Sequence, residues 1–310
     1  MHRRIIALLL IALCACEMPS ARAVDHNREV IRMGNKGPFT QRSDGIGLDL
    51  DNNGPGLVVN GVHDSMFNTS LYVAVEEDFL GFNSIIDVDV TNTEGRQTPW
   101  VVQETSAVGA PTFARSADFD NGAIDLVLEA TSEVQDLTLY WGDEQNIDSD
   151  TEPFCIFRLT YATAPTAAAT LSWGLMSVRD PLQEAIANFA CFSVTGADNN
   201  LDVQSDDATT DVADTDTTVD MVAGTFIETM VSLNSMHGQT DDDLNGASAT
   251  DVHFFTRTTT GGAWTQRNTT TAFSLGADIA LQPFVQVEKT AGTAVPDLRV
   301  DYIRCYWQRE

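Results

Sequence analysis

The chain has 310 residues, with 17 Lys or Arg against 45 Asp or Glu, a formal net charge of −28 and 43% hydrophobic residues. So acidic a chain is not expected to bind nucleic acid, because that binding depends on Lys and Arg displacing counterions from phosphates. Its length allows two domains, but all-β sandwiches and barrels of about 200 to 250 residues often form one.

The N-terminus predicts a secretory signal peptide over residues 1–23. A His-Arg-Arg start precedes an apolar run at 5–13, and a small-x-small cleavage site ends at Ala23. The apolar run is too short to span a bilayer, and no later segment reaches the roughly 20 apolar residues that a spanning helix needs. We therefore expect an exported protein without a transmembrane segment; the alternative is a lipoprotein anchored at Cys16.

Residues 24–70, rich in Gly, Asp and Asn, predict a partly irregular extension that adds a strand or two to a sheet edge, with a flexible arm as the alternative. From 71 to 310, short segments rich in β-branched and aromatic residues recur between turn residues. This spacing predicts one all-β domain, a two-sheet antiparallel β-sandwich. The expected strands cover residues 71–76, 100–104, 123–130, 136–142, 154–162, 169–178, 188–194, 225–233, 251–258 and 263–268, followed by a closing pair.

Two stretches break this pattern. Residues 180–187 predict a short helix, with Asp180 as N-cap and Pro181 at the first helical position. The Asp-rich span 198–220 predicts a long acidic loop. Prolines 153, 165, 181, 283 and 296 are expected at or beside strand ends, where a missing N–H does least harm to a ladder.

The segment 281–309 reads as a closing hairpin, with Gly292 and Pro296 in its connection. Its last strand, VDYIRCYWQ at 300–308, resembles the closing strand VDYIRVYQ of the concanavalin A-like lectin/glucanase superfamily. The resemblance implies a concanavalin A-like jelly roll. From 71 to 308 the layout also resembles uncharacterised exported bacterial proteins and phage virion-associated proteins with laminin G-like folds.

After signal-peptide removal, Cys155, Cys191 and Cys305 allow one disulfide and one remaining thiol. Three buried free thiols are the alternative. The resemblance favours a Cys155–Cys305 disulfide, because in the superfamily the closing strand tends to lie near the strand expected here at 154–159.

The hydrolases of this superfamily carry E-x-D-x-x-E on one strand, and the outer carboxylates act as nucleophile and acid/base. By resemblance, the strand with Arg158 and the strand with Trp173 precede the position of that catalytic strand, which falls here at 187–192. This segment contains no carboxylate, and Glu184 just upstream has no acidic partner at the required spacing. We therefore expect no catalysis. The alternative is a polysaccharide-active enzyme, a glycoside hydrolase or lyase, with non-standard catalytic residues.

Two loops fit the calcium-binding pattern D-x-[DN]-x-[DN]-G, in which oxygen side chains at alternate positions wrap a hard cation. The acid expected at the twelfth position is Asn60 in one loop and Val252 in the other, so solvated turns are the alternative. The resemblance also implies a structural Ca²⁺. The candidate ligands are Asp49, Asp51 and Asn53 in the first loop and Asp241, Asp243 and Asn245 in the second.

Sugar recognition needs flat aromatic faces beside polar groups. Trp264, Trp173 and Trp141 are the candidate rings, and Trp264 follows a Gly-Gly turn that should leave it exposed. Asp143 and Arg158 are possible polar partners. The sequence thus predicts an exported, non-catalytic β-sandwich that binds polysaccharide or cell-surface glycan, or that self-associates as a structural subunit of an envelope or particle.

Overall fold

The computed structural model describes residues 46–49, 56–59, 62–64, 72–79, 86–87, 100–116, 122–166, 168–196, 198–233, 249–258 and 262–308. The chain divides into two compact units, residues 1–72 and 73–310. In the first, β1 (Ile46–Asp49), β2 (Gly56–Val59) and β3 (Val62–Asp64) form a small antiparallel sheet. The expectation that residues 24–70 add a strand or two to the sheet edge stays a prediction. The predicted signal peptide and Cys16 lie outside the described residues.

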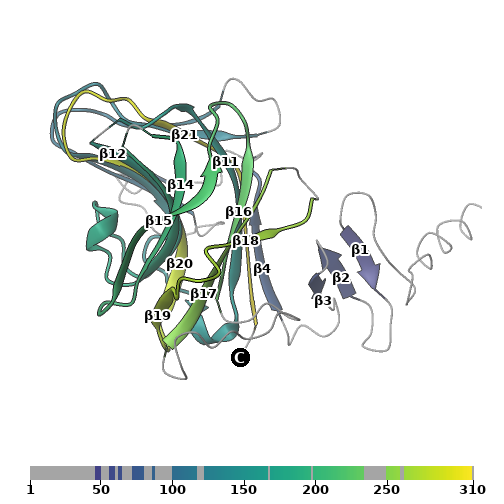
Figure 1. The fold of residues 1–310 in the computed structure, drawn as a ribbon. Helices are drawn as coiled ribbons and strands as arrows, with labels where there is room; N and C mark the ends of the chain where they lie inside the picture. The colour runs from purple at the N-terminus through teal and green to yellow at the C-terminus, as the bar shows by residue number, and fades with distance from the viewer. Residues whose placement is uncertain are drawn as a thin grey trace, which may run out of the picture. The chain divides into compact units, whose positions relative to one another are not determined.

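The second unit consists of two nine-stranded sheets that pack face to face (Figure 1). In sheet I the strand order is β15-β14-β13-β12-β20-β9-β6-β5, with β10 on β20. Its strands are β5 (Ile86–Asp87), β6 (Val101–Ser106), β9 (Gln135–Tyr140), β10 (Ile147–Asp148), β12 (Ala169–Met176), β13 (Phe189–Thr195), β14 (Asn200–Asp206), β15 (Asp211–Asp220) and β20 (Ala280–Lys289).

In sheet II the order is β18-β17-β16-β11-β21-β8-β7, with β19 on β17 and β4 on β21. Its strands are β4 (Tyr72–Glu77), β7 (Thr112–Arg115), β8 (Ile124–Val127), β11 (Phe154–Thr163), β16 (Ile227–Leu233), β17 (Ala249–Arg257), β18 (Thr265–Arg267), β19 (Ser274–Gly276) and β21 (Asp297–Gln308). The pairs with a described register are antiparallel apart from β5–β6, which is parallel. The predicted all-β fold, a two-sheet antiparallel β-sandwich of the jelly-roll type, is confirmed.

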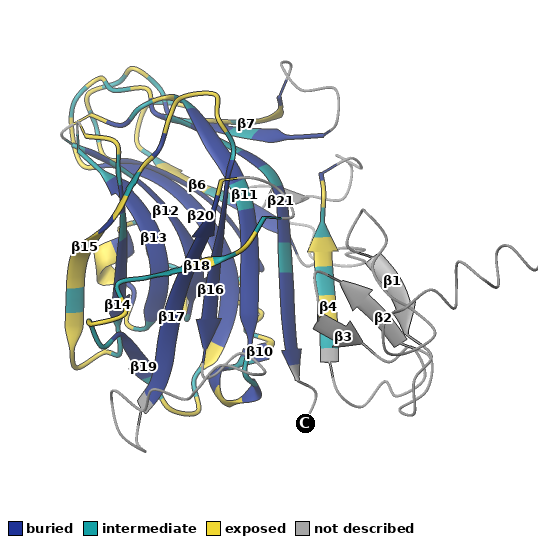
Figure 2. Cartoon of the chain, turned by 45° about the vertical axis from the view of Figure 1, so that its right-hand side comes forward, coloured by how far each residue is buried: buried dark blue, intermediate teal, exposed yellow. Residues whose placement is uncertain are grey.

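The core lies between the sheets, where alternate residues of each strand point inward. Trp173 of β12 donates its Nε1–H to Thr229 Oγ1 of β16 over 2.8 Å. Phe192 of β13 packs edge-on against Phe254 of β17, with ring centroids 5.2 Å apart. Figure 2 shows the central strands buried and β15, at the edge of sheet I, largely exposed.

The closing strands do not form a hairpin. β20 lies between β12 and β9 of sheet I, whereas β21 lies between β11 and β8 of sheet II. Gly292 and Pro296 therefore lie in a connection that crosses from one sheet to the other. Cys155 of β11 and Cys305 of β21, the pair favoured by the resemblance, face each other in register and form a disulfide.

Three local expectations are wrong. The span 198–220 is not a loop but the pair β14–β15, in which Leu201 and Val203 point into the core. Residues 180–187 form only a short 3₁₀ turn, η3 (Gln183–Ala185), because this segment hydrogen-bonds to sheet I. Pro283 lies inside β20, at the gap between its neighbours β9 and β10, where no ladder partner loses a bond.

Candidate functional site

Four side chains form a row across the outer face of sheet II. Arg257 of β17 is paired with Glu228 of β16, which is paired with Arg158 of β11, which is paired with Tyr302 of β21. Residues paired in this way point to the same face of a sheet. Trp264 lies just before β18, with its ring centroid 4.3 Å from the Arg257 guanidinium carbon. We call these five residues the arginine–aromatic row.

Charged contacts fix the geometry of the row. Glu228 is 2% exposed and accepts a charged hydrogen bond from Arg257 Nε. Its second oxygen lies 3.9 Å from Arg158 Nε, and Arg158 Nη1 pairs with Asp301. Burial, with the Glu228 charge as the next cause, raises the pKa of Tyr302, which therefore stays a neutral phenol. The row is preorganised, because strands and ion pairs hold each polar group in place.

Aromatic faces cover the guanidinium groups on this side of the sheet. Arg158 stacks on the Phe226 ring at 4.3 Å, and Arg304 stacks on the Tyr302 ring at 4.2 Å. The Arg158 side chain remains 27% exposed, and Trp264 is half-buried. The surface thus offers planar apolar faces beside hydrogen-bond donors and acceptors.

The structure brings two of the residues named from the sequence, Trp264 and Arg158, to the same face. Trp173 and Trp141 are buried in the core, where Trp141 contacts Trp307 with ring centroids 5.9 Å apart. Asp143, the other polar partner considered, lies in the turn between β9 and β10 and accepts a hydrogen bond from Gln282 Nε2 of β20 in sheet I. Ligand binding by Trp264 stays a prediction.

Sequence reasoning missed a pair of carboxylates on the outer face of sheet I. Asp136 of β9 and Glu288 of β20 are paired in register and are 0% and 6% exposed. Burial raises the pKa of Asp136 to about 6 despite the nearby Arg179. Burial, opposed by a hydrogen bond from Gln183 N and reinforced by the Asp136 charge, raises the pKa of Glu288 to about 7. Only the strand order reveals this pair, since the two residues are far apart in sequence.

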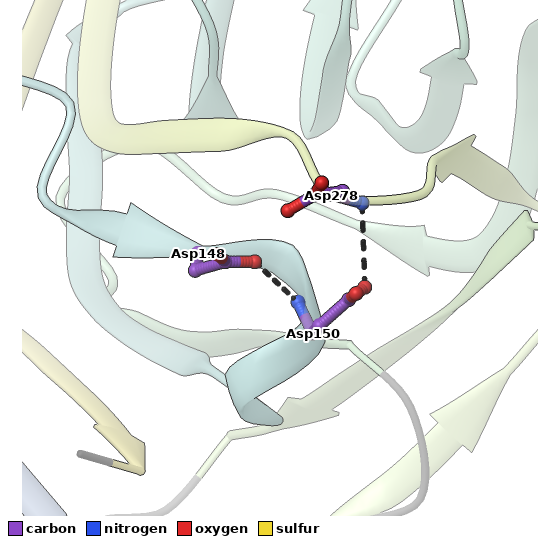
Figure 3. A group of neighbouring side chains, drawn as sticks. All are labelled: Asp148, Asp150 and Asp278. Atoms are coloured by element: carbon purple, nitrogen blue, oxygen red, sulfur yellow. Dashed lines mark hydrogen bonds between the residues drawn. The ribbon is translucent and has the colours of Figure 1, made fainter. Parts of the chain in front are cut away.

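Three other carboxylates gather where β10 meets the connection into β20 (Figure 3). Ligand oxygens of Asp148, Asp150 and Asp278 all lie within 4.8 Å of one another. Asp148 Oδ1 accepts from Asp150 N over 2.9 Å, and Asp150 Oδ1 accepts from Asp278 N over 3.4 Å. Three carboxylates supply part of the six to eight oxygens that Ca²⁺ takes, so this group is a candidate cation site.

Most candidate ligands of the two calcium loops named from the sequence lie outside the described residues: Asp51, Asn53, Asp241, Asp243 and Asn245. For Asp49 only the backbone is described, as the last residue of β1. Ca²⁺ binding by these loops stays a prediction. Among the described residues, no helix has the length and apolar character needed to cross a membrane.

Comparison with known proteins gives structural similarities only. No protein-family model and no curated protein matches the chain. A protein of unknown function from Shewanella oneidensis MR-1 matches with a TM-score of 0.49 and 13% identity, over 77% of this chain and 88% of that one. The VIP36 exoplasmic/lumenal domain in its Ca²⁺/Man-bound form has a TM-score of 0.43 and 8% identity, over 75% and 88%.

The Emp47p carbohydrate recognition domain matches with a TM-score of 0.40 and 11% identity, over 71% of this chain and 92% of that domain. The fold of this chain is established by its own strand order and register, and no activity follows from similarities this low.

Proposed function

We propose that this protein is an exported, non-catalytic β-sandwich that binds a glycan through the arginine–aromatic row. The observation that carries the proposal is the alignment of Arg257, Glu228, Arg158 and Tyr302 in register beside the half-buried Trp264. The apolar face of a sugar ring packs on an indole, and its hydroxyls bond to polar groups held nearby. Arg158, with 27% of its side chain exposed, is the accessible polar group of the row, while the buried Glu228 and Arg257 hold the geometry. The row supplies both on a rigid sheet.

The outward-facing residues of sheet I support a non-catalytic role. The residues of β13 that point away from the core are Phe189, Cys191, Ser193 and Thr195, and none is a carboxylate. Among the acids of this face, Asp136 and Glu288 are buried and bonded to residues of the same chain, so a substrate has no access to them in this conformation. Asp202 and Asp206 of β14 are half-buried, so support for a binding role over hydrolysis comes from β13 and from the burial of Asp136 and Glu288.

The ligand is expected to be neutral. With a formal net charge of −28, the protein repels anionic polysaccharides at long range. Arg158 and Arg257 do not offset this repulsion, because Asp301 and Glu228 already pair with them. A neutral polysaccharide or a neutral cell-surface glycan fits this surface best.

Affinity electrophoresis against a panel of neutral polysaccharides tests the proposal. Trp264→Ala is expected to weaken binding by about tenfold, the effect of losing roughly 1.4 kcal/mol of stacking. Arg158→Ala should weaken binding too. Arg115→Ala is the matched control, since Arg115 is an exposed arginine on β7 of the same sheet, away from the row, and should bind as the wild type does.

Two results would contradict the proposal. Equal binding by the wild type and Trp264→Ala, or no binding by the wild type, removes the glycan site. Release of reducing ends from any of the polysaccharides removes the non-catalytic assignment and favours the enzyme alternative. The role as a structural subunit of an envelope or particle stays a prediction, which sedimentation of the purified protein tests.

A further inference from the structure

Residues 177–188 lie across the outer face of sheet I, and we call them the cover. Arg179 Nη2 of the cover pairs with the buried Asp136 of β9. Gln183 N donates to Glu288 Oε2 of β20 over 2.7 Å. The cover is therefore attached to the two carboxylates with raised pKa values by a bond to each.

Other bonds from sheet I to the cover are also polar. Gln286 Nε2 donates to the carbonyl oxygens of Asp180 and Pro181, over 3.1 and 3.0 Å. The cover contributes Ile186 to an apolar cluster on this face, whereas Val178 is 57% exposed. With little apolar area buried, the attachment of the cover depends on its polar bonds.

The closed cover leaves polar atoms without partners. On this face of sheet I and in the cover itself, several buried side-chain atoms of the described residues make no hydrogen bond. They are Ser172 Oγ, Gln183 Nε2, Gln204 Oε1, Gln286 Oε1 and Arg179 Nε. A buried polar group without a partner opposes burial, and water satisfies it once the group is exposed. These atoms therefore favour an open cover.

The charges around the cover are almost all negative. Glu288 faces Asp136 from β9 and Asp180 and Glu184 from the cover, while its β12 neighbour in register is the neutral Thr170. Arg179 is the cation that faces Asp136.

Glu184 in turn faces acids at the edge of sheet I. The pKa of Glu184 is raised by burial and by the charges of Asp211, Asp214 and Asp206 on β15 and β14. Closing the cover thus holds like charges together, and protonation relieves this repulsion.

We propose that residues 177–188 are a proton-operated cover, which stays on sheet I while Asp136 and Glu288 hold a proton and lifts when both carboxylates are ionised. The direction follows from linkage: the closed form raises the pKa of Glu288 to about 7 and that of Asp136 to about 6, and an open form returns both to water. The closed form binds protons more strongly, so closure weakens as pH rises through these values.

Lifting the cover uncovers a polar strip. Gln103, Thr138, Gln286, Ser172 and Ser193 are paired in register across β6, β9, β20, β12 and β13. Amide and hydroxyl groups along this strip both donate and accept hydrogen bonds. The cover therefore controls access to a second polar surface, on the opposite sheet from the arginine–aromatic row.

Cys191 is a built-in reporter for the cover. It is buried on β13 in the same apolar cluster as Ile186, and Cys155 and Cys305 are joined in the disulfide. We would measure the alkylation rate of Cys191 by iodoacetamide in the full chain, from the mass spectrum of the peptide that contains it. Each rate is compared between wild type and Glu288→Gln at one pH, which cancels the pH dependence of the reagent. The Glu288 charge also contributes to raising the pKa of Cys191, so its loss makes the variant thiol more reactive and acts against the expected ratio.

In Glu288→Gln the side-chain oxygen can still accept the hydrogen bond from Gln183 N, but the side chain cannot ionise. The ratio of wild-type to variant rates is expected to lie within a few-fold of one at about pH 5 and to reach about tenfold or more at about pH 8. Asp136→Asn should behave in the same way, and it serves if Glu288→Gln does not fold by circular dichroism.

Asp202→Asn is the matched control. Burial and the charges of Asp214, Asp198 and Asp216, none of them in the cover, raise the pKa of Asp202 to about 6. Its rate ratio should be the same at both pH values. An equal wild-type to Glu288→Gln ratio at both pH values, or an equal shift in Asp202→Asn, would overturn the proposal. Neither outcome involves Trp264, so this experiment does not test the glycan site, which is tested independently.

Discussion

Removing the disulfide should destabilise the protein by several kcal/mol. Cys155 and Cys305 are 150 residues apart in the chain, so the bond closes most of the sandwich into one covalent loop. In the chain-entropy model, a loop of this length restricts the unfolded state enough to stabilise the fold by about 5 kcal/mol, and measured values are usually about 2 to 4 kcal/mol. Cys155→Ala/Cys305→Ala should therefore lose at least about 2 kcal/mol.

Urea unfolding of the oxidised wild type and of the double variant measures this loss. Cys191→Ala is the control, because Cys191 is a buried thiol that forms no cross-link. The Cys191→Ala variant gives the free energy of unfolding that is lost when one buried sulfur atom no longer packs in the protein. If the double variant loses no more than twice as much as Cys191→Ala, packing alone explains the loss, and the argument from chain entropy is refuted.

Three further predictions follow from the geometry. The free energy of unfolding should be higher at about pH 5 than at about pH 8, because burial raises the pKa of Glu288 from 4.5 to about 7 and that of Asp136 from 3.8 to about 6. Each protonated acid adds to the free energy of unfolding, fully below its ordinary pKa, and this contribution is lost as pH rises through the raised pKa of the folded protein. For Glu288 the loss is about 3 kcal/mol. Urea titrations at the two pH values measure the difference in the free energy of unfolding. Gly174→Ala should cost about 3 kcal/mol or more, measured by thermal melting, because its Cβ would lie 2.1 Å from the Ala190 carbonyl oxygen. Ca²⁺ should raise the melting temperature of the wild type but not of Asp150→Asn, and an unchanged wild type would remove the cation site.

The strands of the core were predictable because their sequences alternate. In β11 and β12, residues such as Phe157, Leu159, Leu171 and Trp173 point inward and are separated by outward positions. Alternation of apolar and polar residues did not predict β15, because most of its residues are exposed to water and few contribute to the core. An acidic edge strand also resists pairing with another chain, which explains why its sequence looks like a loop.

The sequence predicted individual residues of the candidate site but not their arrangement. Trp264 and Arg158 were identifiable from their residue types, but the row also needs Glu228 and Arg257, which join it through the order β17-β16-β11-β21. One sequence does not reveal that order, because β16 and β17 follow β11 only after β12 to β15 have formed the other sheet. The Asp136–Glu288 pair was missed for the same reason, since the search for acids followed single strands.

The two sheets also differ in charge, and this bears on what the protein binds. Arg115, Arg158, Arg257, Arg267, Arg299 and Arg304 lie on strands of sheet II, whereas no strand of sheet I contains an arginine. Sheet I instead carries the Asp-rich β14 and β15 at its edge. Acids on the same sheet pair with Arg158, Arg257 and Arg299, so sheet II presents no net positive charge to β15 of a second copy. About 1 M salt screens the charge interactions that remain within about 3 Å. Stacking of a neutral sugar on Trp264 does not depend on salt. Glycan binding through Trp264 should therefore survive about 1 M salt, and loss of binding at that salt would contradict stacking as its main contribution.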